Sequence, residues 1–436
     1  MIDLTTTRDR RDLVVFTTLV LVALLTAASL VAPPQAAASG TAQPSFTGEV
    51  QPVLTVNIPS EGGYDAAPIN PGNLLGISDI TFGIDNTLKL SAVGDTTAAD
   101  LWLRFNYLPV TEMLTGVAGT PEYVAELVRA VAYWRPTRTV ELAAGRQSLS
   151  SGYGYGWNPV DLISPTKDPS DPGAELRGVD AVSFSWSPVY ALSMRAYGAL
   201  AGYRGSADYD QVLAGGDVTL RIAGAELMLA GLYGGDDPAA GPDPYPNAFG
   251  AAAFVDLFGV GLYAEGSWRP ESRRGTPDGA GQIVADENDT WTALVGLEYF
   301  LPAGPILNAE YFYNGEGYDD QERSAYIGGF AFVLPTDAPA YLGALAPGYF
   351  AQHYVLANMS IPMYTANTTI NVATIVSPDS SMAALSPSVE VNLDFEGSLT
   401  AGLSWNGVFS WDEDDVSEAT LSPLNHTLAV DLAYHF

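Results

Sequence analysis

Charged side chains that recur at every second position of apolar segments are the residues best suited to chemistry in this sequence. Asp100 and Arg104 alternate with Leu101 and Leu103, and Asp431 alternates with apolar neighbours. Carboxylates and guanidinium groups in such rows can bind ions and polar solutes. Strand parity assigns the following candidates to one polar face: Asp100, Arg104, Arg129, Arg135, Glu141, Arg195, Arg221, Glu298, Glu310, Glu390, Asp394 and Asp431.

Residues for covalent or acid–base catalysis are scarce. The chain has three histidines, His353, His426 and His435, and no cysteine. His426 and His435 fall near opposite ends of one predicted strand, and no motif supports a Ser–His pair at His353. No metal-ligand spacing, phosphate loop or dinucleotide fingerprint stands in a suitable context. We therefore predict no enzyme, no metal site and no cofactor.

The overall charge excludes one class of partner. The formal net charge of −32 would repel nucleic acid, and no basic stripe offers a phosphate-binding surface. Acidic clusters at residues 236–237, 286–289, 319–320 and 411–418 could attract divalent cations. None has the spacing of a calcium loop, so solvated surface charge is the favoured interpretation.

Residues 1–38 have the pattern of a cleaved signal peptide. Three arginines precede an uncharged apolar run over residues 13–31, and small residues at 36–38 fit a cleavage site. A retained membrane anchor is the alternative. No later apolar run reaches the roughly 18 residues that a membrane helix needs. We expect residues 39–436 to form one domain that can meet a bilayer again only through strands.

Apolar and polar residues alternate along most of this domain, which predicts an all-β fold. Residues 101–107, 291–299 and 389–396 are clear examples. Short links such as residues 135–138 and 257–260 alternate with longer acidic links rich in Gly and Pro. A closed barrel in lipid needs no second sheet to cover its apolar face. We predict a transmembrane antiparallel barrel of eighteen strands, with sixteen as the alternative.

For one segment the alternation alone does not decide between a strand and a loop. Residues 323–336 look like a strand, but counting them would put short links on both sides of the membrane. We therefore place residues 316–348 in an external loop, with a helical piece near residues 341–345. The strands are expected at 44–57, 77–92, 98–109, 124–135, 138–147, 175–187, 189–201, 212–223, 225–234, 248–257, 260–269, 289–300, 304–315, 349–361, 365–377, 386–396, 398–411 and 425–436.

The last strand ends on an aromatic residue with apolar residues at every second position before it, including Leu432, Tyr434 and Phe436. This pattern resembles the C-terminal signal of bacterial outer-membrane β-barrels. The resemblance implies a bacterial outer-membrane location, contact with outer-membrane lipid, and recognition of Tyr434 and Phe436 by the barrel-assembly machinery. By analogy with porins it also implies a homotrimer.

A long segment rich in glycine and aromatics, "GYGYGWNPVDLISPTKDPSDPG" (152–173), separates the fifth and sixth predicted strands. In general porins of Gram-negative bacteria the third external loop folds inward and narrows the channel. Residues 145–165 also resemble a stretch of alginate-export-like and related carbohydrate porins. This resemblance implies a constriction loop, with aromatic faces suited to sugar rings; the alternative is a surface loop in the interfacial girdle. Its candidate residues are Arg146, Tyr153, Tyr155, Trp157, Asn158 and Asp161, with Arg146 expected beyond the strand end as a loop anchor.

The resemblance and the charge pattern together imply a porin-type channel for passive diffusion of small hydrophilic solutes. Every basic candidate on the polar face precedes residue 270, and the later candidates are all acidic. This distribution predicts a preference for cations and a field across the lumen. Two alternatives remain: the charges pair and only make the wall rigid, or the barrel is closed and has a structural, adhesive or enzymatic role.

Overall fold

The computed structural model describes most of the chain after residue 42. It covers residues 43–60, 62–63, 67–70, 77–108, 122–201, 211–234, 245–302, 304–333, 338–394, 397–412 and 414–436. The predicted signal peptide at residues 1–38 lies outside these ranges.

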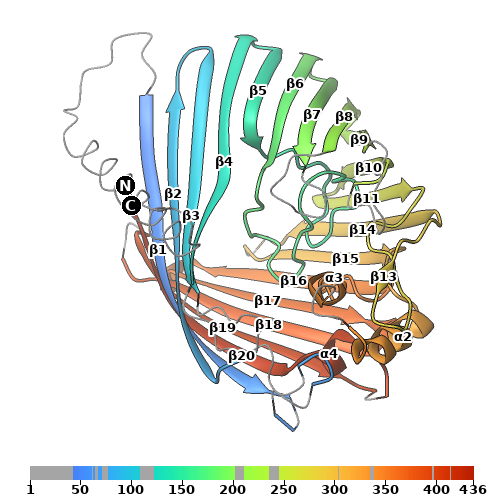
Figure 1. The fold of residues 1–436 in the computed structure, drawn as a ribbon. Coiled ribbons are helices and arrows are strands. Elements are labelled where there is room, and N and C mark those ends of the chain that lie inside the picture. Colours follow the sequence, from blue (N-terminus) through green and yellow to red (C-terminus); the bar gives the residue numbers. More distant parts are fainter. Residues whose placement is uncertain are drawn as a thin grey trace, which may run out of the picture.

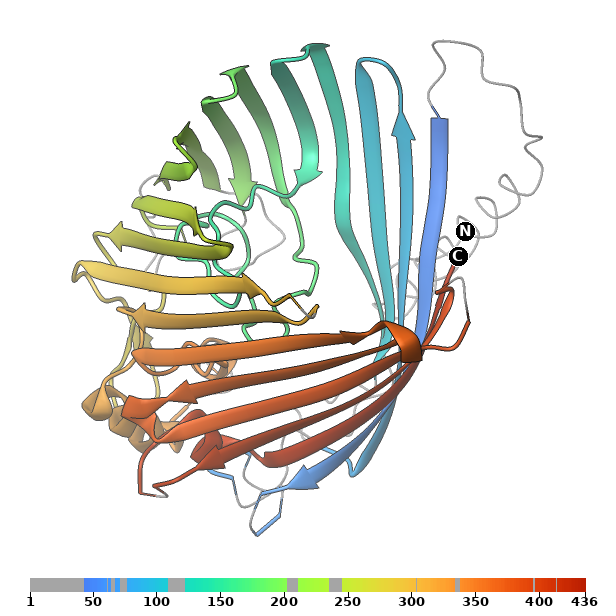
Figure 2. The ribbon, with the colours of Figure 1, turned by 180° about the vertical axis from the view of Figure 1, so that it is seen from behind.

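Eighteen antiparallel strands form one closed barrel (Figures 1 and 2). Consecutive strands pair with each other, and β1 pairs with β20 to close the ring, for example through Val53 opposite Asp431. The prediction of eighteen strands is confirmed and the alternative of sixteen is wrong. The barrel strands are β1 (Gln43–Pro59), β2 (Ile80–Val93), β3 (Thr97–Leu108), β4 (Glu122–Thr137), β5 (Val140–Gln147), β6 (Val179–Val189), β7 (Leu192–Ala201), β8 (Gln211–Ile222), β9 (Ala225–Tyr233), β10 (Ala248–Leu257), β11 (Val260–Arg269), β14 (Thr290–Phe300), β15 (Ile306–Asn314), β16 (His353–Met363), β17 (Thr368–Ser377), β18 (Met382–Asn392), β19 (Leu399–Ser410) and β20 (Leu424–His435).

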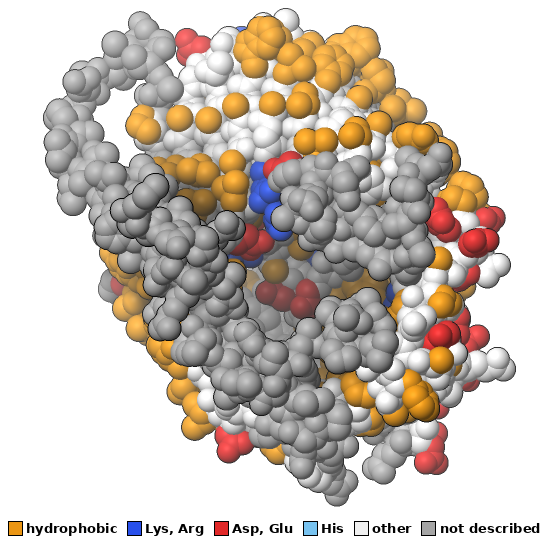
Figure 3. All heavy atoms as spheres, in the orientation of Figure 1, with side chains coloured by type: hydrophobic (Ala, Val, Ile, Leu, Met, Phe, Trp, Pro, Cys, Tyr) orange, Lys and Arg blue, Asp and Glu red, His pale blue; other side chains and the backbone are white. Residues whose placement is uncertain are grey.

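Successive side chains of a strand face the outer surface and the interior of the barrel in turn. On β20 the side chains of Leu428, Val430 and Leu432 are 36–48% exposed, whereas Ala433 on the opposite face is 4% exposed. The outer surface carries bands of hydrophobic side chains, and acidic and basic side chains gather inside the opening (Figure 3). A bilayer can cover the outer bands, and the charged inner face requires water.

Two of the short links are tight turns built on left-handed backbone. Ala223 and Gly224 join β8 to β9 with φ of 53° and 85°, and Phe258 and Gly259 join β10 to β11 with φ of 58° and 83°. Two consecutive positive φ values are typical of type I′ hairpins, whose twist matches that of the flanking strands.

The wall differs from its prediction at β18. This strand starts at Met382, four residues before the predicted start, and the short 3-10 turn η4 (Pro378–Ser380) links it to β17. The strand ends at Asn392, so Asp394 lies beyond the wall and its prediction as a pore-lining residue is wrong. Its carboxylate instead accepts a hydrogen bond from the backbone N–H of Leu399 (3.2 Å) within the link to β19.

Residues 316–348 lie outside the barrel wall, as predicted. They contain helix α2 (Asp320–Phe330) and helix α3 (Ala338–Gly343), so residues 323–330 of the strand-like stretch are helical. α2 begins with a capping box in which Asp319 and Glu322 satisfy each other's backbone N–H groups. A further short helix, α4 (Glu418–Leu421), and the small hairpin β12 (Thr276–Pro277)–β13 (Ile283–Val284) occupy the same end. None of the helices in these described ranges is long and apolar enough to cross a membrane.

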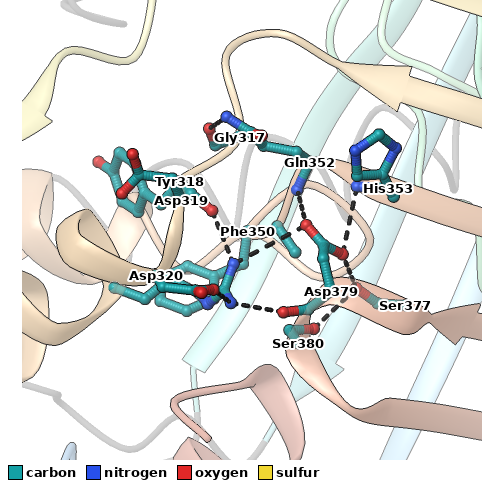
Figure 4. A network of polar contacts seen from close by, with 12 residues as sticks. Gly317, Tyr318, Asp319, Asp320, Phe350, Gln352, His353, Ser377, Asp379 and Ser380 are labelled. Atoms are coloured by element: carbon teal, nitrogen blue, oxygen red, sulfur yellow. Dashed lines mark hydrogen bonds and ion pairs between the residues drawn. The ribbon is translucent and has the colours of Figure 1, made fainter.

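One buried arginine fastens α2 to the barrel rim (Figure 4). Arg323 is 2% exposed and donates hydrogen bonds to the carbonyl oxygens of Tyr318 (2.8 Å) and Asp379 (2.6 Å). The carboxylate of Asp379 accepts from the backbone N–H of Gln352 (3.0 Å) and from the hydroxyl of Ser377 (2.9 Å). α2 is therefore tied to η4 and to the start of β16.

Candidate functional site: the lumen and its third loop

Five predicted arginines of the wall are engaged by carboxylates. These predicted pore-lining bases lie in β3, β4, β7 and β8, and each one forms an ion pair. The pairs are Arg104–Glu126 (3.1 Å), Arg129–Glu175 (2.9 Å), Arg135–Glu141 (2.6 Å), Arg195–Asp217 (2.7 Å) and Arg221–Glu226 (3.0 Å). The alternative of paired charges therefore holds for these bases, and little of their positive charge remains uncompensated.

Several predicted acids of the wall lack such a partner. Within the described ranges, the carboxylates of Asp100, Glu298 and Glu390 form no ion pair and no hydrogen bond. Asp431 accepts a hydrogen bond from the side-chain amide of Gln51 (3.0 Å), which is uncharged. These four acids outnumber Lys89 and Arg269, the two wall bases without an ion pair in the described chain, so the wall carries an excess of negative charge.

The third external loop, residues 148–178, lies inside the barrel (Figures 1 and 2). Arg195 of β7 fixes its start by donating to the carbonyl oxygen of Leu149 (2.9 Å) and to the hydroxyl of Ser151 (2.7 Å). Arg129 of β4 pairs with Glu175 near its end. The predicted inward fold is thus confirmed, and the alternative of a surface loop is wrong.

Two wall glutamates hold the middle of this loop by its backbone. Glu265 of β11 accepts from the N–H groups of Tyr153 and Gly154, the latter at 2.8 Å. Glu310 of β15 accepts from the N–H groups of Tyr155 and Gly156, the latter at 2.8 Å. Successive backbone N–H groups that converge on one carboxylate form an anion-binding nest. The carboxylates therefore act as receptors for the loop.

The glycines at every second position make these nests possible. A Cβ on Gly154 would collide with the carbonyl oxygen of Trp157, and a Cβ on Gly156 would lie 2.6 Å from Leu356 Cδ1. Gly152 has φ of 97°, in the left-handed region that favours glycine. The glycines of the repeat are thus explained by close approach of the loop backbone both to other loop residues and to the wall.

The aromatic residues of the repeat mostly face the wall. Trp157 is 0% exposed, stacks on Phe312 with ring centroids 5.1 Å apart, and donates its indole N–H to the carbonyl oxygen of Gly348 (3.0 Å). The expectation that Trp157 offers a face to sugar rings is therefore wrong, because its ring fills the space behind the loop.

The two tyrosines of the repeat are partly exposed and tied by their hydroxyls. Tyr153 donates to Glu226 (3.3 Å), and Tyr155 accepts from the amide of Asn358 (3.0 Å). Burial and the nearby charge of Glu226 raise the pKa of Tyr153 to about 12, so its hydroxyl remains a donor at neutral pH.

The remaining loop candidates have separate roles. Asp161 accepts from the backbone N–H of Ser164 (3.1 Å), as expected for a turn former, whereas the side chain of Asn158 forms no hydrogen bond within the described chain. Arg146 still lies within β5, so its placement beyond the strand end is wrong. It pairs with Asp180 of β6 and donates to the carbonyl oxygen of Leu127 (3.0 Å), which ties β4, β5 and β6 together.

Sequence reasoning placed Glu265 on the polar face without a role at the loop, and it did not select Trp102. Trp102 lies between the ammonium group of Lys89 (4.1 Å) and the guanidinium group of Arg129 (4.2 Å). The available signal was its position among polar residues of an otherwise alternating strand. Glu265 had the same parity signal as the other acids, but its long-range partner, the loop, leaves no local pattern.

The C-terminal residues complete the seam between the last and first strands. The backbone N–H of Phe436 donates to the carbonyl oxygen of Gly48 (3.0 Å), and its ring lies against Phe46 (5.6 Å) and Tyr434 (6.1 Å). Gly48 leaves room for this ring, since a Cβ there would lie 2.8 Å from Phe436 Cε2. Recognition of these residues by an assembly machinery stays a prediction.

The described residues offer little for catalysis. No group of His, Asp or Glu among them is arranged to hold a metal ion. His353, for which a serine partner was left open, instead has its Nδ1 atom 2.8 Å from the hydroxyl of Tyr311.

Comparison with known proteins gives matches in structure alone. No family model matches the chain, and no curated protein matches it in sequence. OccAB1 of Acinetobacter baumannii is similar with a TM-score of 0.55 and 10% identity, over 93% of this chain and 99% of that chain. OccK5 (OpdH) of Pseudomonas aeruginosa gives a TM-score of 0.53 with 8% identity, over 92% and 99%. The resemblance to alginate-export-like channels stays a prediction. The chain therefore has the closed eighteen-stranded fold of outer-membrane porins.

Proposed function

We propose that this chain is an outer-membrane channel for passive diffusion of small hydrophilic solutes, with a preference for cations. One observation carries the preference: each of the five arginines predicted to line the pore on β3 to β8 is paired with a carboxylate, whereas Asp100, Glu298 and Glu390 have no ion pair or hydrogen bond in the described chain. Unpaired carboxylates on a water-filled wall raise the local concentration of cations. The charged inner face supports a wet lumen, since charges of this number have no place in a packed apolar interior.

The test is single-channel recording of the purified protein in a planar bilayer under a potassium chloride gradient. We expect stepwise conductance and a reversal potential of the sign for cation selectivity. The variant E298Q/E390Q should shift the reversal potential toward zero. The matched variant R221Q frees Glu226 from its ion pair and should shift it the other way. Absence of conductance from folded protein, or anion selectivity, would overturn the proposal and favour a closed barrel.

Export by a cleaved signal peptide over residues 1–38, recognition of Tyr434 and Phe436 during assembly, and a homotrimeric state belong to the same proposal. A preference for sugars is not part of it, because the ring of Trp157 is fully buried.

A further inference from the structure

A small cavity lies between the third loop and the barrel wall. Its volume is about 100 Å³. Loop residues 158–167 line one side, and residues of β11, β14 and β15 line the other, among them Arg269, Thr292 and Asn314. The cavity lies behind the loop, at the end of β11 that leads to the external hairpin β12–β13.

Arg269 differs from the other arginines of the wall. It is 2% exposed, and its guanidinium group donates to the hydroxyl of Ser267 (3.0 Å), its single hydrogen-bond partner in the described chain. No carboxylate of the described ranges forms an ion pair with it. Glu316 is close enough to interact electrostatically, but Arg273 already holds both of its oxygens (2.8 and 3.1 Å to Oε2, and 2.8 Å from the backbone N–H to Oε1).

Other unused donors line the same cavity. The side-chain amide of Asn158 forms no hydrogen bond in the described chain, and its Oδ1 atom is buried. Lys167 lines the cavity and donates to the carbonyl oxygen of Gly154 (3.3 Å). Asp161 is the one carboxylate among the lining residues.

A buried guanidinium group with free donors is costly unless an anion compensates it. Of the lining cations, Lys167 interacts with the nearby carboxylates of Glu310, Glu265 and Asp161, and Arg273 is neutralised by Glu316. Arg269 is the one whose carboxylate neighbour, Glu316, is already held by another arginine. On this measure one water molecule needs about 10–15 Å³, so the cavity has room for a small anion with some water.

We propose that this cavity binds a small monovalent anion, a halide ion or a carboxylate group, between Arg269 and Asn158. The bound anion bridges β11 and the loop and so holds the loop in place. This site is independent of the proposed transport function, because it lies behind the loop and the wall acids do not contribute to it.

The first test is thermal unfolding of the detergent-purified barrel, titrated with sodium bromide against sodium gluconate at constant ionic strength. Gluconate is the control because it is a much bulkier anion than bromide. We expect a saturable rise of the unfolding midpoint with bromide, and a parallel titration with acetate separates halides from carboxylates. The variant R269Q should weaken the bromide dependence at least about tenfold, the loss expected for one charged hydrogen-bond donor. The variant R221Q, whose arginine is paired elsewhere, should retain it.

The second test needs no variant and so remains decisive if R269Q fails to fold. Anomalous diffraction from crystals of the unmodified protein grown in bromide should show a peak within hydrogen-bond distance of the Arg269 guanidinium group. Absence of the peak, or an equal bromide dependence in R269Q, overturns the proposal. A peak without any saturable stabilisation means an adventitious ion only and also overturns it. Conductance recorded on the same preparation decides the transport function separately.

Discussion

Replacement of Glu310 by alanine removes the acceptor for the backbone N–H groups of Tyr155 and Gly156. A hydrogen bond to a charged group contributes about 1.5–3 kcal/mol, so loss of these two bonds should weaken docking of the loop by about 3–6 kcal/mol. The longer contact with the N–H of Trp157 (3.4 Å) adds little. At about 1.4 kcal/mol per factor of ten, the equilibrium for local opening should rise roughly 10²- to 10⁴-fold.

Hydrogen exchange at residues 153–157, measured at neutral pH in detergent, reports this opening directly. We expect protection of these amides to fall by the same factor in E310A, while the strands of the barrel keep theirs. E310Q should have an intermediate effect, because its amide oxygen can accept but its NH₂ group opposes the loop donors. E298A removes a wall acid that has no partner in the described chain and serves as the control. Equal protection in E310A and the unmodified protein would refute the idea that Glu310 holds the loop.

Three further outcomes follow from the packing and the charges. Burial opposes ionisation of Glu316, but the guanidinium groups of Arg273 and Arg269 dominate and lower its pKa to about 2. A lowered pKa adds stability above the unfolded value near 4.5, about 3 kcal/mol, and this stability is lost as pH falls from 4.5 toward 2. Unfolding midpoints across this range should therefore fall less in E316Q than in the unmodified protein, and parallel curves would contradict the assignment. G154A should displace the loop, seen as lost exchange protection at residues 153–157 in a barrel of unchanged strand content by circular dichroism; retained protection would contradict the close approach to Trp157. F436A should lower the yield of folded, heat-resistant barrel in membranes, since it removes the ring at the seam, and an unchanged yield would argue against a role in assembly.

The fold was largely predictable because the bilayer imposes a period of two on each strand. β10 and β11 were predicted with the bounds that the structure has. The start of β18 was predicted four residues too far along the chain. Its first residues, Met382 to Leu385, are apolar on both faces where they adjoin the interior cluster around Trp157, so they show no alternation. α2 was not predicted as a helix because residues 326–330 in its second half are aromatic, β-branched or glycine, and because its position depends on Arg323 and the turn at Asp379.

The site was predictable in part. Strand parity identified the charged face, but it could not show which acids bind arginines and which bind the loop. Glu310 and Tyr155 are separated by 155 positions in the chain, so no local pattern relates them. Arg146 was misplaced because its partner Asp180 has the same unexpected parity on the neighbouring strand, and the pair is visible only once the register is known.

The two glutamates that hold the loop stand on β11 and β15, with β14 between them. This part of the wall supports the loop, so substitutions there would change the position of the loop as well as the passage of solutes. Engineering of permeability should therefore begin on a different arc, at β18 to β20, where Glu390 of β18 and Asp431 of β20 line an open pocket. Gly402 of β19, between them, leaves room for the Asp431 carboxylate. In this barrel β11 to β15 support the loop, and β18 to β20 offer a surface that can be changed without touching it.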